Sequence, residues 1–342
     1  MTASPASAPR SRIVSEINLD EDGKQLGYLR LPHSVHRSAY GWIPIPFACV
    51  RNGDGPRVLL MAGNHGDEYE GQIAFADLLR ELEPADITGR VLFLTSANFP
   101  AAMAGMRTSP IDDGNLNRSF PGDPNGNVTD QIAFYIEHQI LPQCDYVFDF
   151  HSGGSSLMYI PSALGRRNED PAVTARLVEL MEQFGAPISY ITDSPQGDDR
   201  TLTAAAARQG VLAMGSELGG GGTLTPAALN TAKQGIRRIL KSIGVLGERI
   251  ATEPAPATQV MRVGGPDYFV YAPESGLFEP RVELGEEVSA GQTAGLIHFH
   301  DTPWREPATA VFAHDGIVLC KRMPCRAERG DCLFHLGTPY QS

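Results

Sequence analysis

The sequence predicts an α/β protein with a mixed β-sheet flanked by helices, followed by a smaller all-β domain. Two observations support this fold class. Short apolar runs alternate with longer amphipathic segments between residues 57 and 246, and no helical periodicity continues after residue 259. A stretch rich in proline and alanine separates the two regions. We therefore expect an α/β domain at residues 13–250, a linker at 251–258 and an all-β domain at 259–342.

The N-terminal residues 1–12 are polar and are expected to be disordered. They lack the apolar core of a secretory signal, which favours a cytoplasmic protein. Residues 13–50 contain the irregular β-type runs GYLRLP and IPIPFACV. These runs are expected to add strands at the edge of the sheet.

The α/β domain shows two kinds of periodicity. Short apolar runs predict strands at residues 57–62, 90–97, 146–150, 189–192 and 211–216. Segments with a 3.6-residue period predict helices at residues 69–82, 129–140, 171–184, 202–208 and 226–243. Pro226 suits the first position of the last helix. Strands that alternate with helices predict a largely parallel sheet covered on both faces.

The all-β domain is predicted from short β-type runs separated by glycine, proline and aspartate. An approximate repeat, residues 272–277 against 313–317, resembles the two halves of biotinyl/lipoyl-type hammerhead domains. The segment has no Met-Lys-Met-like tip that could carry a covalent cofactor. We therefore expect this domain to be structural or to form a wall of the active site.

Composition excludes several classes of function. The net charge is −12 with an isoelectric point near 5.2, and no run of Lys or Arg suggests nucleic-acid binding. No apolar run approaches the ~20 residues of a membrane span. Five cysteines, an odd number, favour reduced thiols over a disulfide framework. The expected partner is a small molecule, and a homo-oligomer stays possible.

The strongest motif is Gly63-Asn-His65-Gly-Asp-Glu68, between a predicted strand and a predicted helix. Ligands of open α/β sheets bind at the carboxyl ends of strands. His151 follows another strand in the motif DFHSGG. Two histidines and one carboxylate, with a position left for water, form a ligand set of catalytic zinc sites. Asp149 shares a strand face with His151 and can orient a ligand histidine.

Three further features extend this site. Glu217 directly follows the predicted strand at 211–216 and precedes Leu218 and four glycines, where it can act as a general base. Asn117 and Arg118 offer donors that suit a substrate carboxylate. Arg107, in the same long polar loop, can stabilise an oxyanion.

Structural alternatives exist for each motif. The histidines can be ordinary hydrogen-bonding residues, Glu217 a solvated charge, and Arg118 a partner of Asp112 or Asp113. A metal site could also be built from other histidine pairs, His298 with His300 or His33 with His36. These pairs lack the glycine-rich loops of the main motif.

In this order, H65-G-D-E68, R107, N117-R118, D149-F-H151 and S216-E217-L-G219 resemble the motifs of the succinylglutamate desuccinylase/aspartoacylase family, a branch of the zinc carboxypeptidase-like fold. The resemblance covers residues 57–246. It implies one Zn²⁺ per chain held by His65, Glu68 and His151. It also implies that Glu217 is the general base, that Asn117 and Arg118 bind the substrate carboxylate, and that Arg107 polarises the scissile carbonyl. Arg107 lies farther from Asn117 than in aspartoacylase.

The resemblance implies hydrolysis of a small N-acyl amino acid. Within the family, the motifs NHGDEYEGQIA, NRSFPG, DFHSGG and APESGLFEP are similar to those of members that deacetylate Nα-acetyl-L-2,4-diaminobutyrate in ectoine degradation. That substrate requires an acid for its side-chain ammonium, and four acidic residues are candidates: Asp193, Asp198, Asp199 and Glu279. The alternatives are an aspartoacylase or succinylglutamate desuccinylase type of deacylase, a metallocarboxypeptidase, and a small-molecule binding protein on the same scaffold.

Overall fold

The computed structural model describes residues 10–193 and 198–341 and confirms the α/β fold class. Residues 1–12 were expected to be disordered, and most of them, residues 1–9, lie outside the described residues. In the described part of the chain, no helix is both long and apolar enough to cross a bilayer.

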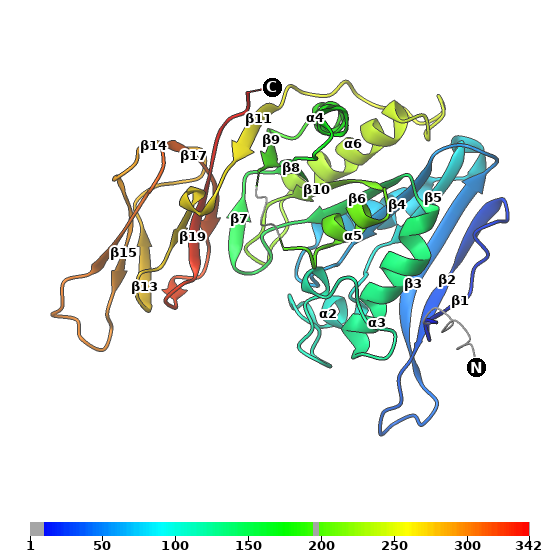
Figure 1. The fold of residues 1–342 in the computed structure, drawn as a ribbon, viewed down its shortest axis with the longest axis horizontal. Helices are drawn as coiled ribbons and strands as arrows, with labels where there is room; N and C mark the ends of the chain where they lie inside the picture. The colour runs from blue at the N-terminus through cyan, green and yellow to red at the C-terminus, as the bar shows by residue number, and fades with distance from the viewer. Residues whose placement is uncertain (1–9, 194–197, 342) are drawn as a thin grey trace, which may run out of the picture.

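A long mixed sheet forms the centre of the molecule (Figure 1). Its strands lie in the following order: β1 (Val14–Ser15), β2 (Gly23–Pro32), β3 (Trp42–Asn52), β5 (Gly89–Leu94), β4 (Arg57–Ala62), β6 (Tyr146–His151), β10 (Leu212–Glu217), β8 (Ser162–Arg166), β9 (Ile188–Thr192), β11 (Gln259–Val263), β19 (Cys332–Pro339), β17 (Gly316–Arg322) and β14 (Glu287–Val288). Two short strands join its side: β12 (Phe269–Tyr271) pairs with β19, and β7 (Leu157–Tyr159) pairs with β17. A separate antiparallel sheet contains β16 (Ala308–Val311), β15 (Thr293–His298), β13 (Gly276–Pro280) and β18 (Arg326–Ala327).

Helices cover both faces of the central sheet. The first face packs against α1 (Glu70–Glu81), α4 (Pro171–Phe184) and α6 (Pro226–Ser242). The opposite face packs against α3 (Val128–Tyr135) and α5 (Leu202–Arg208), beside the short α2 (Phe99–Ala104). β4, β5, β6 and β10 run parallel and are buried between these layers. Their carboxyl ends therefore share one edge of the sheet.

Local sequence signals explain where the long helices begin and end. Asp170 accepts a hydrogen bond from the backbone N–H of Ala172 at the start of α4, and Thr225 does the same for Ala228 in α6. Both helices have proline in the first turn, where its missing N–H costs nothing. Gly185 ends α4 with φ 69°, a left-handed conformation that favours glycine.

The structure differs from the predicted elements in a few places. The predicted helix at 129–140 is α-helical only to Tyr135 and continues as a π-helix, Ile136–Ile140. The predicted strand at 90–97 ends at Leu94. α2, β7 and β8 were not predicted. The sequence of β8, SALGR, lacks a continuous apolar run, because one of its faces borders a polar pocket.

The C-terminal residues are joined to the central sheet. β11 pairs in parallel with β9, and β17 pairs with β7, which lies between the His151 loop and β8 in sequence. A buried cluster of apolar side chains contains Ile188 and Tyr190 of β9 together with residues of the C-terminal strands. The C-terminal strands therefore contact the segment that follows His151.

Candidate active site

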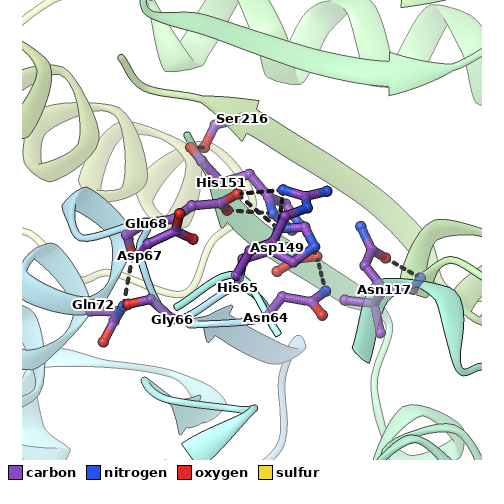
Figure 2. Close-up of polar contacts among 12 residues, drawn as sticks. Asn64, His65, Gly66, Asp67, Glu68, Gln72, Asn117, Asp149, His151 and Ser216 are labelled. Atoms are coloured by element: carbon purple, nitrogen blue, oxygen red, sulfur yellow. Dashed lines mark hydrogen bonds and ion pairs between the residues drawn. The ribbon is translucent and has the colours of Figure 1, made fainter. Parts of the chain in front are cut away.

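Three side chains converge at the carboxyl ends of β4 and β6 (Figure 2). His65 and Glu68 lie in the loop between β4 and α1, and His151 is the last residue of β6. Nδ1 of His65 lies 2.7 Å from Oε1 of Glu68, and Nδ1 of His151 lies 2.7 Å from Oε2 of the same carboxylate. One ligand atom from each residue lies within 4.8 Å of the other two. Among the described residues, this is the only group of three or more such side chains that could hold a metal ion.

The outer nitrogen of each histidine meets an acceptor. Nε2 of His151 lies 2.7 Å from Oδ2 of Asp149, and Nε2 of His65 lies 3.1 Å from Oδ1 of Asn115. A proton on Nε2 of each ring would satisfy these acceptors and leave the lone pair of Nδ1 directed toward the shared centre. Asp149 also accepts a hydrogen bond from Nδ2 of Asn64 at 3.1 Å. This arrangement suits metal ligation.

The charges at this centre favour a cation. Burial alone raises the pKa of Glu68, but the charges of His65 and His151 outweigh it and hold the pKa below its usual range. Burial alone lowers the pKa of His151, but Asp149 and Glu68 outweigh it and raise that pKa well above its ordinary value. Six buried side-chain oxygens lack a partner among the described residues, and four of them belong to the two ligand motifs or to Glu217: Asn64 Oδ1, Asp67 Oδ1, Asp149 Oδ1 and Glu217 Oε2. Acceptors without donors are the groups that a bound cation or water would satisfy.

Close backbone packing fixes the two ligand loops. A Cβ on Gly66 would lie 2.1 Å from the carbonyl carbon of Ala101, so only glycine fits between His65 and Glu68 at this point. The buried carboxylate of Asp67 accepts the backbone N–H of Ser155 at 2.7 Å. The first ligand loop is thereby tied to the loop that follows His151.

Glu217 lies at the end of β10, directly beside His151 in the parallel pairing of β10 with β6. Its Oε2 is buried and has no hydrogen-bond partner among the described residues. Burial raises the pKa of Glu217 well above its usual range, and the Glu68 carboxylate adds to this, whereas His151 and Arg107 oppose it. A carboxylate of high proton affinity beside the ligand set can exchange a proton with a reacting water.

A pocket of about 400 Å³ opens above these residues. Its floor is one face of the sheet, because Gly215 is paired with Asp149 on one side and with Leu164 on the other. The remaining lining residues are Arg107, Asn117, Arg118, Ser152, Gly153, Leu157, Tyr159, Gly165, Arg166, Thr192, Asp198, Thr201 and Thr203, together with the ligands and Glu217. All of these residues precede the C-terminal strands in sequence. The C-terminal strands therefore reach this pocket only through β7, which lines it and pairs with β17.

The three predicted polar residues of the long loop all reach this pocket. Nη1 of Arg107 lies 3.3 Å from Nδ1 of His65 and 3.4 Å from Oε1 of Glu68. Oδ1 of Asn117 accepts the backbone N–H of Leu202 at 2.9 Å, which leaves the NH₂ end of the amide as the donor. Nε of Arg118 lies 3.2 Å from Oδ2 of Asp198.

The structural alternatives for these side chains find less support. Arg118 pairs with Asp198, whereas Asp112 accepts hydrogen bonds from Thr129. His298 contacts Glu279 at 2.6 Å on the exposed face of β15. Among the described residues, neither His298 with His300 nor His33 with His36 belongs to a group of three side chains that could hold a metal ion.

The structure distinguishes among the four acidic candidates for recognition of a substrate ammonium by their positions relative to the pocket. Only Asp198 lines the pocket. Asp193 is paired with Arg167 and Arg262, and Glu279 lies in the C-terminal antiparallel sheet. Asp199 is exposed outside the pocket lining.

Sequence reasoning did not assign roles to Asn115, Asn64 or Tyr159. Asn115 lies in a loop rich in Gly, Asp and Asn, where such residues ordinarily form turns. Tyr159 belongs to the unpredicted β7. Asn64 was visible within the first ligand motif, and its place between a strand end and His65 is the signal that could have identified it.

Comparison with known proteins adds to this geometry. The family described as the succinylglutamate desuccinylase/aspartoacylase catalytic domain matches residues 54–243. The chain is 36% identical over 342 residues to the N-alpha-acetyl-L-2,4-diaminobutyric acid deacetylase of Halomonas elongata, a match that covers 100% of this chain and 99% of the relative.

Solved structures agree with this relationship. A succinylglutamate desuccinylase/aspartoacylase from Rhodobacter sphaeroides is similar with a TM-score of 0.91 and 40% identity, covering 97% of this chain and 100% of that chain. The product-bound ectoine utilization protein EutE (DoeB) from Ruegeria pomeroyi is similar with a TM-score of 0.91 and 37% identity, covering 96% and 99%. The family match spans more than half of the chain and the relatives match nearly all of it, so the chain belongs to the succinylglutamate desuccinylase/aspartoacylase family.

Proposed function

We propose that this protein is a zinc-dependent amidohydrolase that deacetylates Nα-acetyl-L-2,4-diaminobutyrate. The observation that carries the proposal is the convergence of His65, Glu68 and His151 beside Glu217, whose Oε2 is buried. The printed activity of the Halomonas elongata relative, which matches over the full chain, supports the choice of substrate. The similarity to EutE, described as an ectoine utilization protein, supports the same choice.

His65, Glu68 and His151 would hold one Zn²⁺ through Nδ1, a carboxylate oxygen and Nδ1. Two imidazoles and one carboxylate form the ligand set of several hydrolytic zinc enzymes, and both imidazoles here have their outer nitrogen bonded to an acceptor. When bound, Zn²⁺ would supply Lewis acidity, which polarises an acyl carbonyl and lowers the pKa of a water.

Glu217 would act as the general base and then as the general acid. It takes a proton from the attacking water as the new C–O bond forms at the acyl carbon. It then delivers that proton to the amide nitrogen as the C–N bond breaks, so that acetate and the free amine leave. Its buried Oε2 and its raised pKa support proton transfer in both directions.

The two arginines of the pocket would bind the negatively charged groups of the reaction, which are the oxyanion and the substrate α-carboxylate. Arg107, whose guanidinium already faces His65 and Glu68, would stabilise the oxyanion of the tetrahedral intermediate. Arg118 and the amide NH₂ of Asn117 would bind the α-carboxylate of the substrate. Asp149 would orient His151 through the contact at 2.7 Å.

We also propose separate roles for the α/β domain and the all-β domain. Residues 13–250 would form the catalytic domain, 251–258 the linker and 259–342 the all-β domain. The pairing of β17 with β7 supports a role for the all-β domain in holding Tyr159 at the pocket. The cytoplasmic location and the oligomeric state stay predictions that cell fractionation and light scattering would test.

The proposal is tested by measuring acetate, aspartate and succinate release from purified zinc-loaded protein. The substrates are Nα-acetyl-L-2,4-diaminobutyrate, N-acetylaspartate and succinylglutamate. We expect release from the first and little from the others. Preferred cleavage of either of the other two would keep the mechanism and replace the substrate, and cleavage of peptides instead would favour a carboxypeptidase.

The role of Glu217 is tested with Glu217→Gln. This variant should lose at least about 100-fold in kcat, the lower range for removal of a general base, while its zinc content stays at the wild-type value. Glu182→Gln, the same change at an exposed position of α4, is the matched control and should keep full activity. Near-normal turnover in Glu217→Gln would remove Glu217 from the proposed role.

A further inference from the structure

One carboxylate at the pocket is used neither by the ligand set nor for proton transfer. Four acidic side chains line the pocket: Glu68, Asp149, Glu217 and Asp198. The first three lie at the ends of β4, β6 and β10, around the proposed zinc. Asp198 lies beside Arg118, in the segment that leads into α5.

Arg200 holds the carboxylate of Asp198 in a fixed orientation. Its Nε and Nη2 lie 2.8 Å from Oδ1 and from Oδ2, and its backbone N–H donates to Oδ1 at 3.0 Å. The fourth contact is made by Arg118, whose Nε lies 3.2 Å from Oδ2. It is the longest of the four contacts, and it is the one made by a residue that also faces the pocket.

The pair Arg118–Asp198 carries the two charges that are complementary to a diamino acid. Arg118 suits an α-carboxylate, and Asp198 suits a side-chain ammonium. When a substrate carboxylate takes Arg118, Oδ2 of Asp198 loses its fourth donor and can accept one from the ammonium. Each of the two protein charges exchanges one partner for another, so neither is left unpaired in the occupied pocket.

Resting on the function proposed above, we propose that Asp198 binds the side-chain ammonium of the N-acyl amino acid and thereby selects diamino acid derivatives over neutral and acidic ones. Arg200 is then a positioning residue, because it orients Asp198 and does not line the pocket. The other acidic candidates, Asp193 and Glu279, do not reach the pocket lining and are paired with cations elsewhere.

The test compares two substrates of nearly the same shape. Nα-acetyl-L-norvaline has a methyl group where Nα-acetyl-L-2,4-diaminobutyrate has its ammonium. Both are assayed for acetate release with wild-type protein, with Asp198→Asn and with Asp199→Asn as the matched control on the adjacent exposed residue. Zinc content and the midpoint of thermal unfolding verify that each variant is folded.

Wild type should favour the diaminobutyrate derivative in kcat/KM. Asp198→Asn should lower kcat/KM for that substrate by about 10- to 100-fold, as expected for loss of a hydrogen bond between charged groups, and should change the norvaline derivative by less than about threefold. Asp199→Asn should leave both values unchanged.

Three results would overturn the inference. Equal losses on both substrates would mean that Asp198 only positions Arg118. Equal wild-type activity on both would mean that the ammonium is not recognised, while the deacetylase function would stand. If wild type released acetate from neither, the proposed function would fail, and this inference would fail with it.

Discussion

Removal of the Asp149 carboxylate should weaken zinc binding without removing any ligand. In the structure Oδ2 of Asp149 lies 2.7 Å from Nε2 of His151 and 3.1 Å from Nδ2 of Asn64. The variant Asp149→Ala leaves His65, Glu68 and His151 in place. It removes the acceptor that fixes the His151 ring and that makes its Nδ1 a more basic ligand.

The size of the effect follows from the kind of bond that is lost. Loss of such a carboxylate partner typically costs 10- to 100-fold in metal affinity, which corresponds to about 1.4 to 2.8 kcal/mol. Asn115→Ala removes the corresponding acceptor from His65, but that acceptor is a neutral amide at 3.1 Å. Neutral hydrogen bonds are about half as strong as charge-assisted ones, so its loss should be below about tenfold.

Zinc affinity is measured by competition with a chromophoric chelator at constant pH. Asp145→Ala, at the opposite end of the same strand, is the control and should bind zinc like wild type, because Asp145 contacts Arg57 at the surface. An affinity of Asp149→Ala within about twofold of wild type, in a variant that is folded, would refute the assigned role of Asp149.

Two further predictions concern stability. Gly66→Ala would place a methyl group 2.1 Å from the Ala101 carbonyl carbon and should destabilise the fold by about 1–3 kcal/mol in urea denaturation, whereas a change below about 0.5 kcal/mol would show that the loop can move. His335 is 4% exposed and stacks on Phe269, and burial lowers its pKa from 6.5 to about 4. Because the folded pKa is the lower one, unfolding takes up a proton between these values, so stability is full above pH 6.5 and falls as the pH drops. Between pH 7 and 5 this amounts to about 2 kcal/mol, which His335→Phe should lose from its pH profile; an unchanged profile would contradict the assignment.

The sequence was sufficient to predict the elements that carry the ligands. The runs RVLLMA and YVFDF form β4 and β6, which are buried between two helical layers and are therefore almost continuously apolar. Their carboxyl ends bring His65, Glu68 and His151 together across 83 residues of sequence between Glu68 and His151. The four glycines at 219–222 similarly marked the end of β10.

Other parts of the site depend on contacts that no local pattern records. β7 is a strand of three residues, and the strand that pairs with it, β17, lies far along the chain. Asn115 contacts Nε2 of His65, which lies 50 residues earlier in the sequence. Nothing in the sequence distinguishes this asparagine from an ordinary turn residue. Asp198 could not be chosen from the other acids, because the choice depends on the fold that brings it to Arg118.

The central claim is that one zinc ion, held by His65, Glu68 and His151, is required for amide hydrolysis. The most direct measurement is a zinc titration of chelator-treated protein, with acetate release from Nα-acetyl-L-2,4-diaminobutyrate recorded at each addition. We predict that activity is absent without metal, rises linearly, and reaches its maximum at one zinc per chain. Full activity in the metal-free protein, or a titration in which His151→Ala behaves like wild type, would contradict the claim.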